Sequence, residues 1–258
     1  MSTAANEKGS LAAPTTEAWS VVVLVAIAGS CWALTVVRMR GMDMGPGTDL
    51  GELGWFAVVW VTMMAAMMLP SLSPMAIASS RAAGSGRVGS VGRTVAFAIG
   101  YLLAWVAFGV LAYAVVDGVG SLDLGFLAWN RAGQYLAGAV ILGAALYELT
   151  TVKGRCLRHC REPDLLQRRR GAAGAVRMGV EQGAFCVGCS GALMVALFAL
   201  GVMSIAWMLV IAALVAIEKL LPWTAITIGT TVLVLALLGT AVLLVPDHVP
   251  WLTIPMSM

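Results

Sequence analysis

The chain has 258 residues, of which 60% are hydrophobic and only 11% are charged. Soluble domains carry roughly 25% charged residues, so this composition excludes an ordinary soluble domain and predicts an integral membrane protein surrounded by lipid. The formal net charge of +3 gives no indication of a nucleic-acid partner.

The apolar runs predict one all-helical transmembrane bundle over residues 18–246, between a disordered polar tail (1–17) and a short C-terminal tail (247–258). We favour seven spans, because Val176 to Ile217 has the length of two helices. An alternative leaves Val176–Ser190 at the membrane interface and gives six. The seven predicted spans are Trp19–Val37, Gly54–Ala78, Val91–Val116, Leu127–Thr151, Val176–Leu200, Ile205–Leu221 and Thr224–Val245.

Loop charges predict the orientation, because cytoplasmic loops are enriched in lysine and arginine. The loop 153–175 is strongly basic, and the loop after the second span contains Arg81, Arg87 and Arg93 with no acidic residue between them. We expect both loops in the cytoplasm, which also places the N-terminus there. The prediction is a multi-pass protein of the bacterial inner (plasma) membrane.

Four of the five cysteines form two close pairs, Cys156-x3-Cys160 and Cys186-x2-Cys189. On a helix each pair shares one face, which is the spacing of a soft-metal site or of a redox-active dithiol. His159 adds an imidazole to the first pair, and the neighbouring arginines favour the thiolate form that binds metal. The alternative is that these cysteines only fill space as small apolar side chains.

The depth of the two pairs leaves their relation open. The first pair would lie where the fourth span leaves the membrane, whereas Cys186 would lie roughly 15 Å along the fifth helix. One shared site would require residues 153–170 to fold back into the bundle. Two separate sites along a path fit the sequence equally well.

The second predicted span is rich in methionine. Met63 and Met67, and Met64 and Met68, are i,i+4 pairs, so they form two adjacent rows of thioethers on a helix. Thioethers favour Cu(I) over hard cations, although methionine is also a common filler of irregular gaps. Pro70 is expected to break this helix.

Three acidic residues are expected near the cytoplasmic ends of spans, namely Glu148, Glu181 and Glu218. Acids at bilayer depth are costly and often serve as ligands or proton carriers, so they could form a proton or ion pathway. The alternative is pairing with nearby Lys153 or Arg177.

Several of these motifs occur together in one family. Met63-Met-Ala-Ala-Met-Met-Leu-Pro-Ser71, both cysteine pairs, Gly201-Val-Met203 and Glu218-Lys219 resemble an uncharacterised bacterial family described as predicted metal-binding integral membrane proteins. The resemblance runs from about Trp55 to Pro222 and implies a polytopic metal-handling protein. The chain departs from the family pattern at Gln182 and Ser190, where a histidine and a third cysteine are common.

These observations favour a binding or transport protein over an enzyme. We expect a protein that binds Cu(I), with zinc as the other candidate metal, and that takes part in metal transport or in delivery to a metal-requiring apoenzyme. The chain has no P-loop, so we do not expect it to pump with ATP. The alternatives are an accessory subunit of a larger membrane complex and a membrane thiol–disulfide redox protein.

Overall fold

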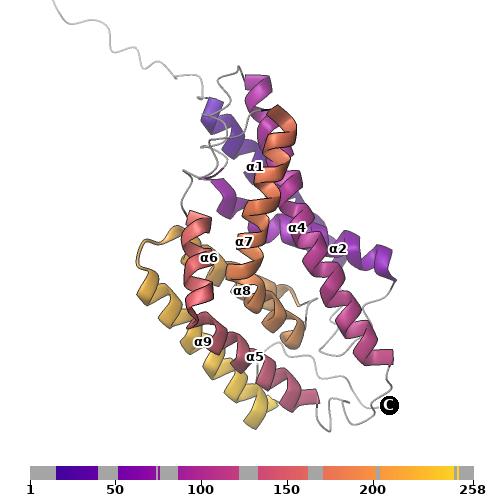
Figure 1. The fold of residues 1–258 in the computed structure, drawn as a ribbon. Helices are drawn as coiled ribbons and strands as arrows, with labels where there is room; N and C mark the ends of the chain where they lie inside the picture. Colours follow the sequence, from indigo (N-terminus) through magenta and orange to yellow (C-terminus); the bar gives the residue numbers. More distant parts are fainter. Residues whose placement is uncertain are drawn as a thin grey trace, which may run out of the picture.

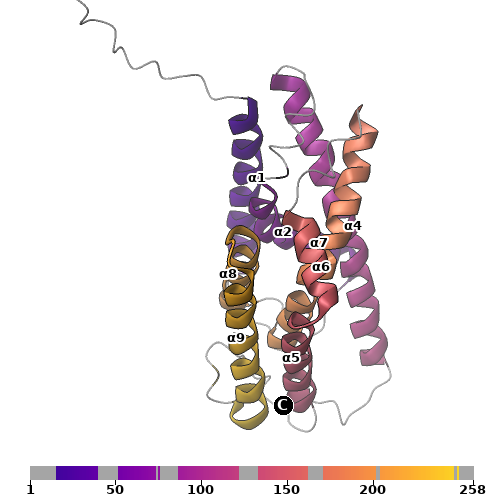
Figure 2. The same cartoon turned by 60° about the vertical axis from the view of Figure 1, so that its left-hand side comes forward.

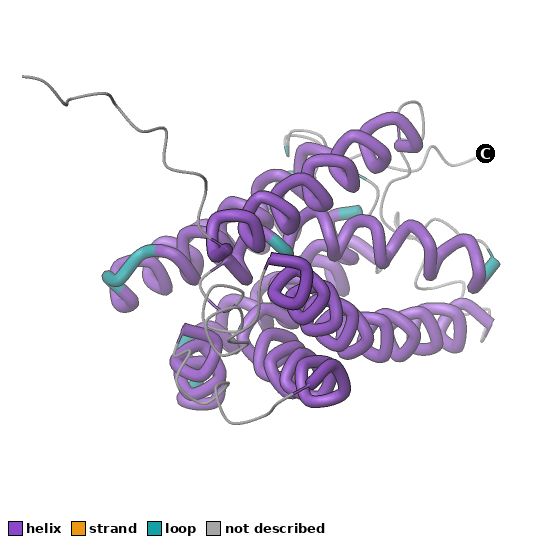
Figure 3. Tube along the Cα trace, turned by 90° about the horizontal axis from the view of Figure 1, so that it is seen from above, coloured by secondary structure: helices purple, strands orange, loops and turns teal. Residues whose placement is uncertain are grey.

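The computed structural model describes residues 16–39, 52–73, 75, 87–121, 133–161, 171–201, 204–246 and 249. Regular structure in these ranges is helical throughout, as the sequence predicts (Figure 3). The elements in chain order are α1 (Thr16–Met39), α2 (Leu53–Met68), the short 3-10 helix η1 (Pro70–Leu72), α4 (Arg87–Ser121), α5 (Gln134–Glu148), α6 (Thr151–Arg161), α7 (Gly171–Leu200), α8 (Ile205–Leu220) and α9 (Thr224–Leu244) (Figure 1).

Four of these helices, α1, α4, α7 and α9, are long and apolar enough to cross a membrane. α5 and α6 together would form a fifth crossing as one broken span. α2 and α8 have 16 residues each, about 24 Å at 1.5 Å per residue, which is less than the roughly 30 Å of a bilayer core. The described residues are therefore compatible with four or five crossings, and the seven-span arrangement with a cytoplasmic N-terminus stays a prediction.

α7 packs along α4 through backbone contact (Figures 1 and 2). A Cβ atom on Gly179 would collide with the carbonyl of Phe97 and the amide of Tyr101, and one on Gly100 would collide with the backbone of Val176. Small residues permit this kind of close approach between helices in lipid. The glycines of the α4–α7 contact therefore fix the helix that carries Cys186 and Cys189.

α2 is held in the bundle by aromatic side chains and ends before the predicted span Gly54–Ala78 does, at the predicted break near Pro70. The indole Nε1 of Trp60 donates to the carbonyl of Trp105 at 2.9 Å, and the Trp60 ring stacks on Phe198 at 5.3 Å between centroids. The helix ends at Met68, because Pro70 has no N–H to continue the hydrogen-bond ladder.

α5 and α9 lie side by side and run in opposite directions, since Gly138 lies against Leu243 and Gly239 against Leu142. After α5 the chain turns at Leu149 and Thr150, and the axis of α6 makes an angle of 66° with that of α5. This turn places α6 against α7. The bend decides where the first cysteine pair lies.

Candidate metal centre

The two cysteine pairs meet where α6 packs on the middle of α7. The Sγ atoms of Cys160 on α6 and Cys189 on α7 are 3.5 Å apart, and Cys160 also interacts with Cys186. The side chains of Cys186 and Cys189 are buried, whereas Cys160 is partly exposed. The bend after α5 thus supplies the return into the bundle that a shared thiol site requires.

Cys156 lies one turn earlier on α6, against the backbone of α7. A Cβ atom on Gly188 would be 2.7 Å from its Sγ, so a side chain at position 188 would push α6 away. The hydroxyl of Tyr147 donates to the carbonyl of Gly188 at 2.6 Å and so holds α5 to the same point. Cys156 therefore lies beside Gly188, next to the cluster formed by Cys160, Cys186 and Cys189.

A half-buried ammonium group and a hydroxyl group contact Cys186. The Sγ atom is 2.8 Å from Lys219 Nζ and 2.8 Å from the hydroxyl of Tyr101. Lys219 Nζ also reaches Ser71 Oγ at 3.5 Å and Met68 Sδ at 3.9 Å. An ammonium group in this position can pair with a thiolate, which is the form of cysteine that binds a soft metal.

The predicted methionine rows are buried, and one of their members reaches Lys219. Met63, Met64 and Met67 belong to the hydrophobic core. Met68, at the end of α2, is connected to Cys186 through the ammonium group of Lys219. The structure thus brings Met68, one of the predicted four, to the ammonium group that contacts Cys186.

The ring of His159 lies against α7. Its ring stacks on Phe185 with 4.3 Å between centroids and 26° between planes. The sequence predicts the histidine and the first cysteine pair on one face of a helix, and the role of the imidazole as a ligand stays a prediction.

Two of the three predicted acids lie together and the third lies elsewhere. Glu148 and Glu218 both bind the buried ammonium group of Lys153, the second at 2.7 Å, and all three side chains are at most 2% exposed. Glu181 is on the surface, 3.4 Å from Arg177. The structure therefore shows the alternative given above, in which these acids pair with Lys153 and Arg177.

The sulfur ligands of the cluster suit a soft metal. Within the described ranges, no group of three or more histidine, cysteine, aspartate or glutamate side chains is arranged to hold a metal ion. The 3.5 Å between the Sγ atoms of Cys160 and Cys189 is close to the about 3.8 Å expected for two thiolates on one tetrahedral zinc. Thiolates and thioethers also select Cu(I).

Sequence reasoning missed the surroundings of Cys186. Lys219 could have been found, because a lysine in an apolar helix must find a partner. Tyr101 carries no such signal, since a tyrosine in an apolar helix is ordinary, and only the packing of α4 on α7 brings it to the thiol.

Comparisons with known proteins point to copper. A family model described as "PpoB2: Copper chaperone" matches residues 57–242, well over half of the chain and all of the cysteine pairs described above. No curated protein and no solved structure matches the chain. The chain belongs to the PpoB2 copper chaperone family.

Proposed function

We propose that the chain binds Cu(I) as cargo through Cys160, Cys186 and Cys189 and takes part in copper transport or in delivery to a metal-requiring apoenzyme. The observation that supports this most directly is the 3.5 Å between thiols of two different helices in a member of a copper chaperone family. Cys156 and Met68 are the adjacent soft ligands, and zinc is the other metal that a thiolate cluster would accept.

The length of α7 supports a position of the thiols near one membrane face. Its 30 residues span about 45 Å, roughly 15 Å more than a bilayer core. If the polar first turns with Arg177 and Glu181 project from the membrane, Cys186 lies within a few turns of the surface. We propose the cytoplasmic face of the inner membrane, because α6 and the residues after it are basic.

We also propose roles for the membrane domain, the methionines of α2 and the buried acids. Residues 18–246 would form one membrane domain, and Met63, Met64 and Met67 would offer a thioether path from the opposite side toward Met68. Glu148 and Glu218 would provide the protonatable groups of a proton-coupled step, since the sequence has no P-loop.

Metal analysis of purified protein tests the proposal. The variant Cys160→Ser with Cys189→Ser should lose the stoichiometric Cu(I) that the wild-type protein retains after anaerobic loading, because each helix loses a thiolate. Cys31→Ser is the matched control, since Cys31 lies on α1 and should not affect binding. Equal copper content in all three proteins would refute the assignment.

The same short distance favours a second candidate, a thiol–disulfide exchange protein. The Sγ atoms of Cys160 and Cys189 would have to approach by only about 1.5 Å to form a disulfide bond. The two electrons and two protons released would reduce the disulfide of an exchange partner. Acid quenching of cells followed by maleimide labelling distinguishes the candidates, because exchange predicts two populations of these thiols and copper binding predicts one.

A further inference from the structure

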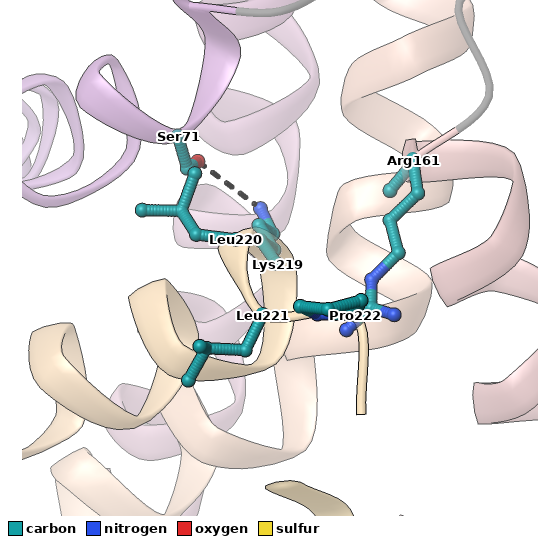
Figure 4. A pocket seen from close by; sticks show the side chains of 7 residues that line it. Ser71, Arg161, Lys219, Leu220, Leu221 and Pro222 are labelled. Atoms are coloured by element: carbon teal, nitrogen blue, oxygen red, sulfur yellow. Dashed lines mark hydrogen bonds between the residues drawn. The ribbon is translucent and has the colours of Figure 1, made fainter. Parts of the chain in front are cut away.

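A small pocket opens onto the exposed side of the thiol cluster. It has a volume of about 140 Å³ and lies between η1, the end of α6 and the end of α8 (Figure 4). Its lining includes Cys160, which is partly exposed, whereas Cys186 and Cys189 are buried behind it. A ligand in this pocket would reach Cys160 before the other thiols.

The pocket is cationic. Arg161 and Lys219 both line it, and its lining contains no carboxylate. The acid nearest in sequence, Glu218, turns its side chain to Lys153 instead. The guanidinium of Arg161 is held by Thr224 Oγ1 at 2.8 Å and by the carbonyl of Glu218, while its Nε has no hydrogen-bond partner. Two cationic side chains therefore line the pocket through which Cys160 is reached.

The volume limits what can enter. One water molecule requires at least about 15 Å³ by this kind of measure, and drug-sized ligands occupy pockets of about 300 Å³ or more. The pocket therefore accepts a small organic molecule rather than a folded partner or a large cofactor.

We propose that the pocket admits a small anionic thiol that carries Cu(I), and that Cys160 is the first residue to take the copper. This inference rests on the proposed copper function. In the exchange, the bond between copper and Cys160 Sγ forms while the bond between copper and the donor sulfur breaks. The proton of the Cys160 thiol leaves on the donor thiol, and copper stays Cu(I). Cys189, whose Sγ is 3.5 Å away, is the next ligand.

Two donors of nearly equal size and opposite charge test the proposal. Purified protein is loaded anaerobically from Cu(I)–mercaptopropionate or from Cu(I)–cysteamine, and bound copper is measured against time. The wild-type protein should load at least about threefold faster from the anionic donor at low salt, because fixed charge raises the encounter rate of the opposite charge. High salt should remove the difference.

Variants of the pocket should change the preference without changing the final copper content. Arg161→Gln and Leu220→Glu should each reduce it, because each lowers the charge of the pocket by one unit, and the two changes together should abolish it. Because Leu220 is 60% exposed, its replacement does not disturb packing. Arg158→Gln is the matched control, an exposed arginine of the same helix outside the pocket, and should retain the wild-type preference.

The outcomes separate the two proposals. Equal loading rates from both donors, or an unchanged preference in Leu220→Glu, would overturn the pocket assignment while leaving the copper site in place. If the wild-type protein binds no copper from either donor, or if Cys160→Ser with Cys189→Ser binds as much, the proposed function itself is wrong and the pocket assignment falls with it.

Discussion

Replacement of Lys153 by methionine should be among the most destabilising single changes in the described part of the protein. The ammonium group lies between the carboxylates of Glu148 and Glu218, and the second oxygen of each carboxylate, Oε1, has no hydrogen-bond partner. Lys153→Met would leave two adjacent buried carboxylates without their counter-charge. Breaking a buried ion pair by removing one partner costs about 3–5 kcal/mol.

The expected effect is large enough to measure by thermal unfolding in mild detergent. At about 2–4 °C per kcal/mol for a chain of this size, the melting temperature should fall by about 6–20 °C. Arg155→Met is the control, because Arg155 is an exposed cation of the same helix. Lys153→Met combined with Glu148→Gln and Glu218→Gln should recover most of the loss. The reasoning fails if Lys153→Met melts within about 2 °C of the wild-type protein, or if the combined variant is no more stable than the single one.

Two further changes probe the contacts of the thiol cluster. Met68→Leu keeps the volume of the side chain but removes the thioether, so it should weaken Cu(I) binding, measured in competition with a chelator, while the melting temperature changes little. Met63→Leu is its control. Equal Cu(I) affinities of the two variants would exclude Met68 as a ligand. Gly188→Ala should destabilise the protein by about 1–3 kcal/mol and lower its copper content, because the new methyl group would lie 2.7 Å from Cys156 Sγ. Gly143→Ala faces open space and should be neutral, so equal melting of the two alanine variants would argue against the α6–α7 contact.

The helices and their ends could largely be predicted from the sequence, because their signals are local. The end of α2 before Pro70 and the start of α8 at Ile205 both follow from breakers and apolar runs. The pairs Glu148 with Lys153 and Arg177 with Glu181 could be predicted for the same reason, since each joins residues four or five apart.

The shared thiol site could not be predicted, because it depends on a turn with no strong local signal. Residues Leu149 and Thr150 contain neither glycine nor proline, yet the chain turns there by 66° and α6 packs on α7. From the sequence we could infer only that a shared site requires residues 153–170 to fold back into the bundle. The stacking of His159 on Phe185 depends on the same packing and could not be predicted either.

The two helices that carry the thiols are held in the bundle in different ways. α7 contacts α4 backbone to backbone, so Cys186 and Cys189 cannot shift without separating the two helices. α6 is tied at its end by separate side-chain bonds, from Gln182 to the carbonyl of Cys160 at 3.3 Å and from Arg161 to Thr224 at 2.8 Å, which can break one at a time. If the centre binds copper as proposed, its α7 side is fixed and its α6 side is adjustable, so a change in coordination number would be met by rotation of the 11-residue α6 about its bend.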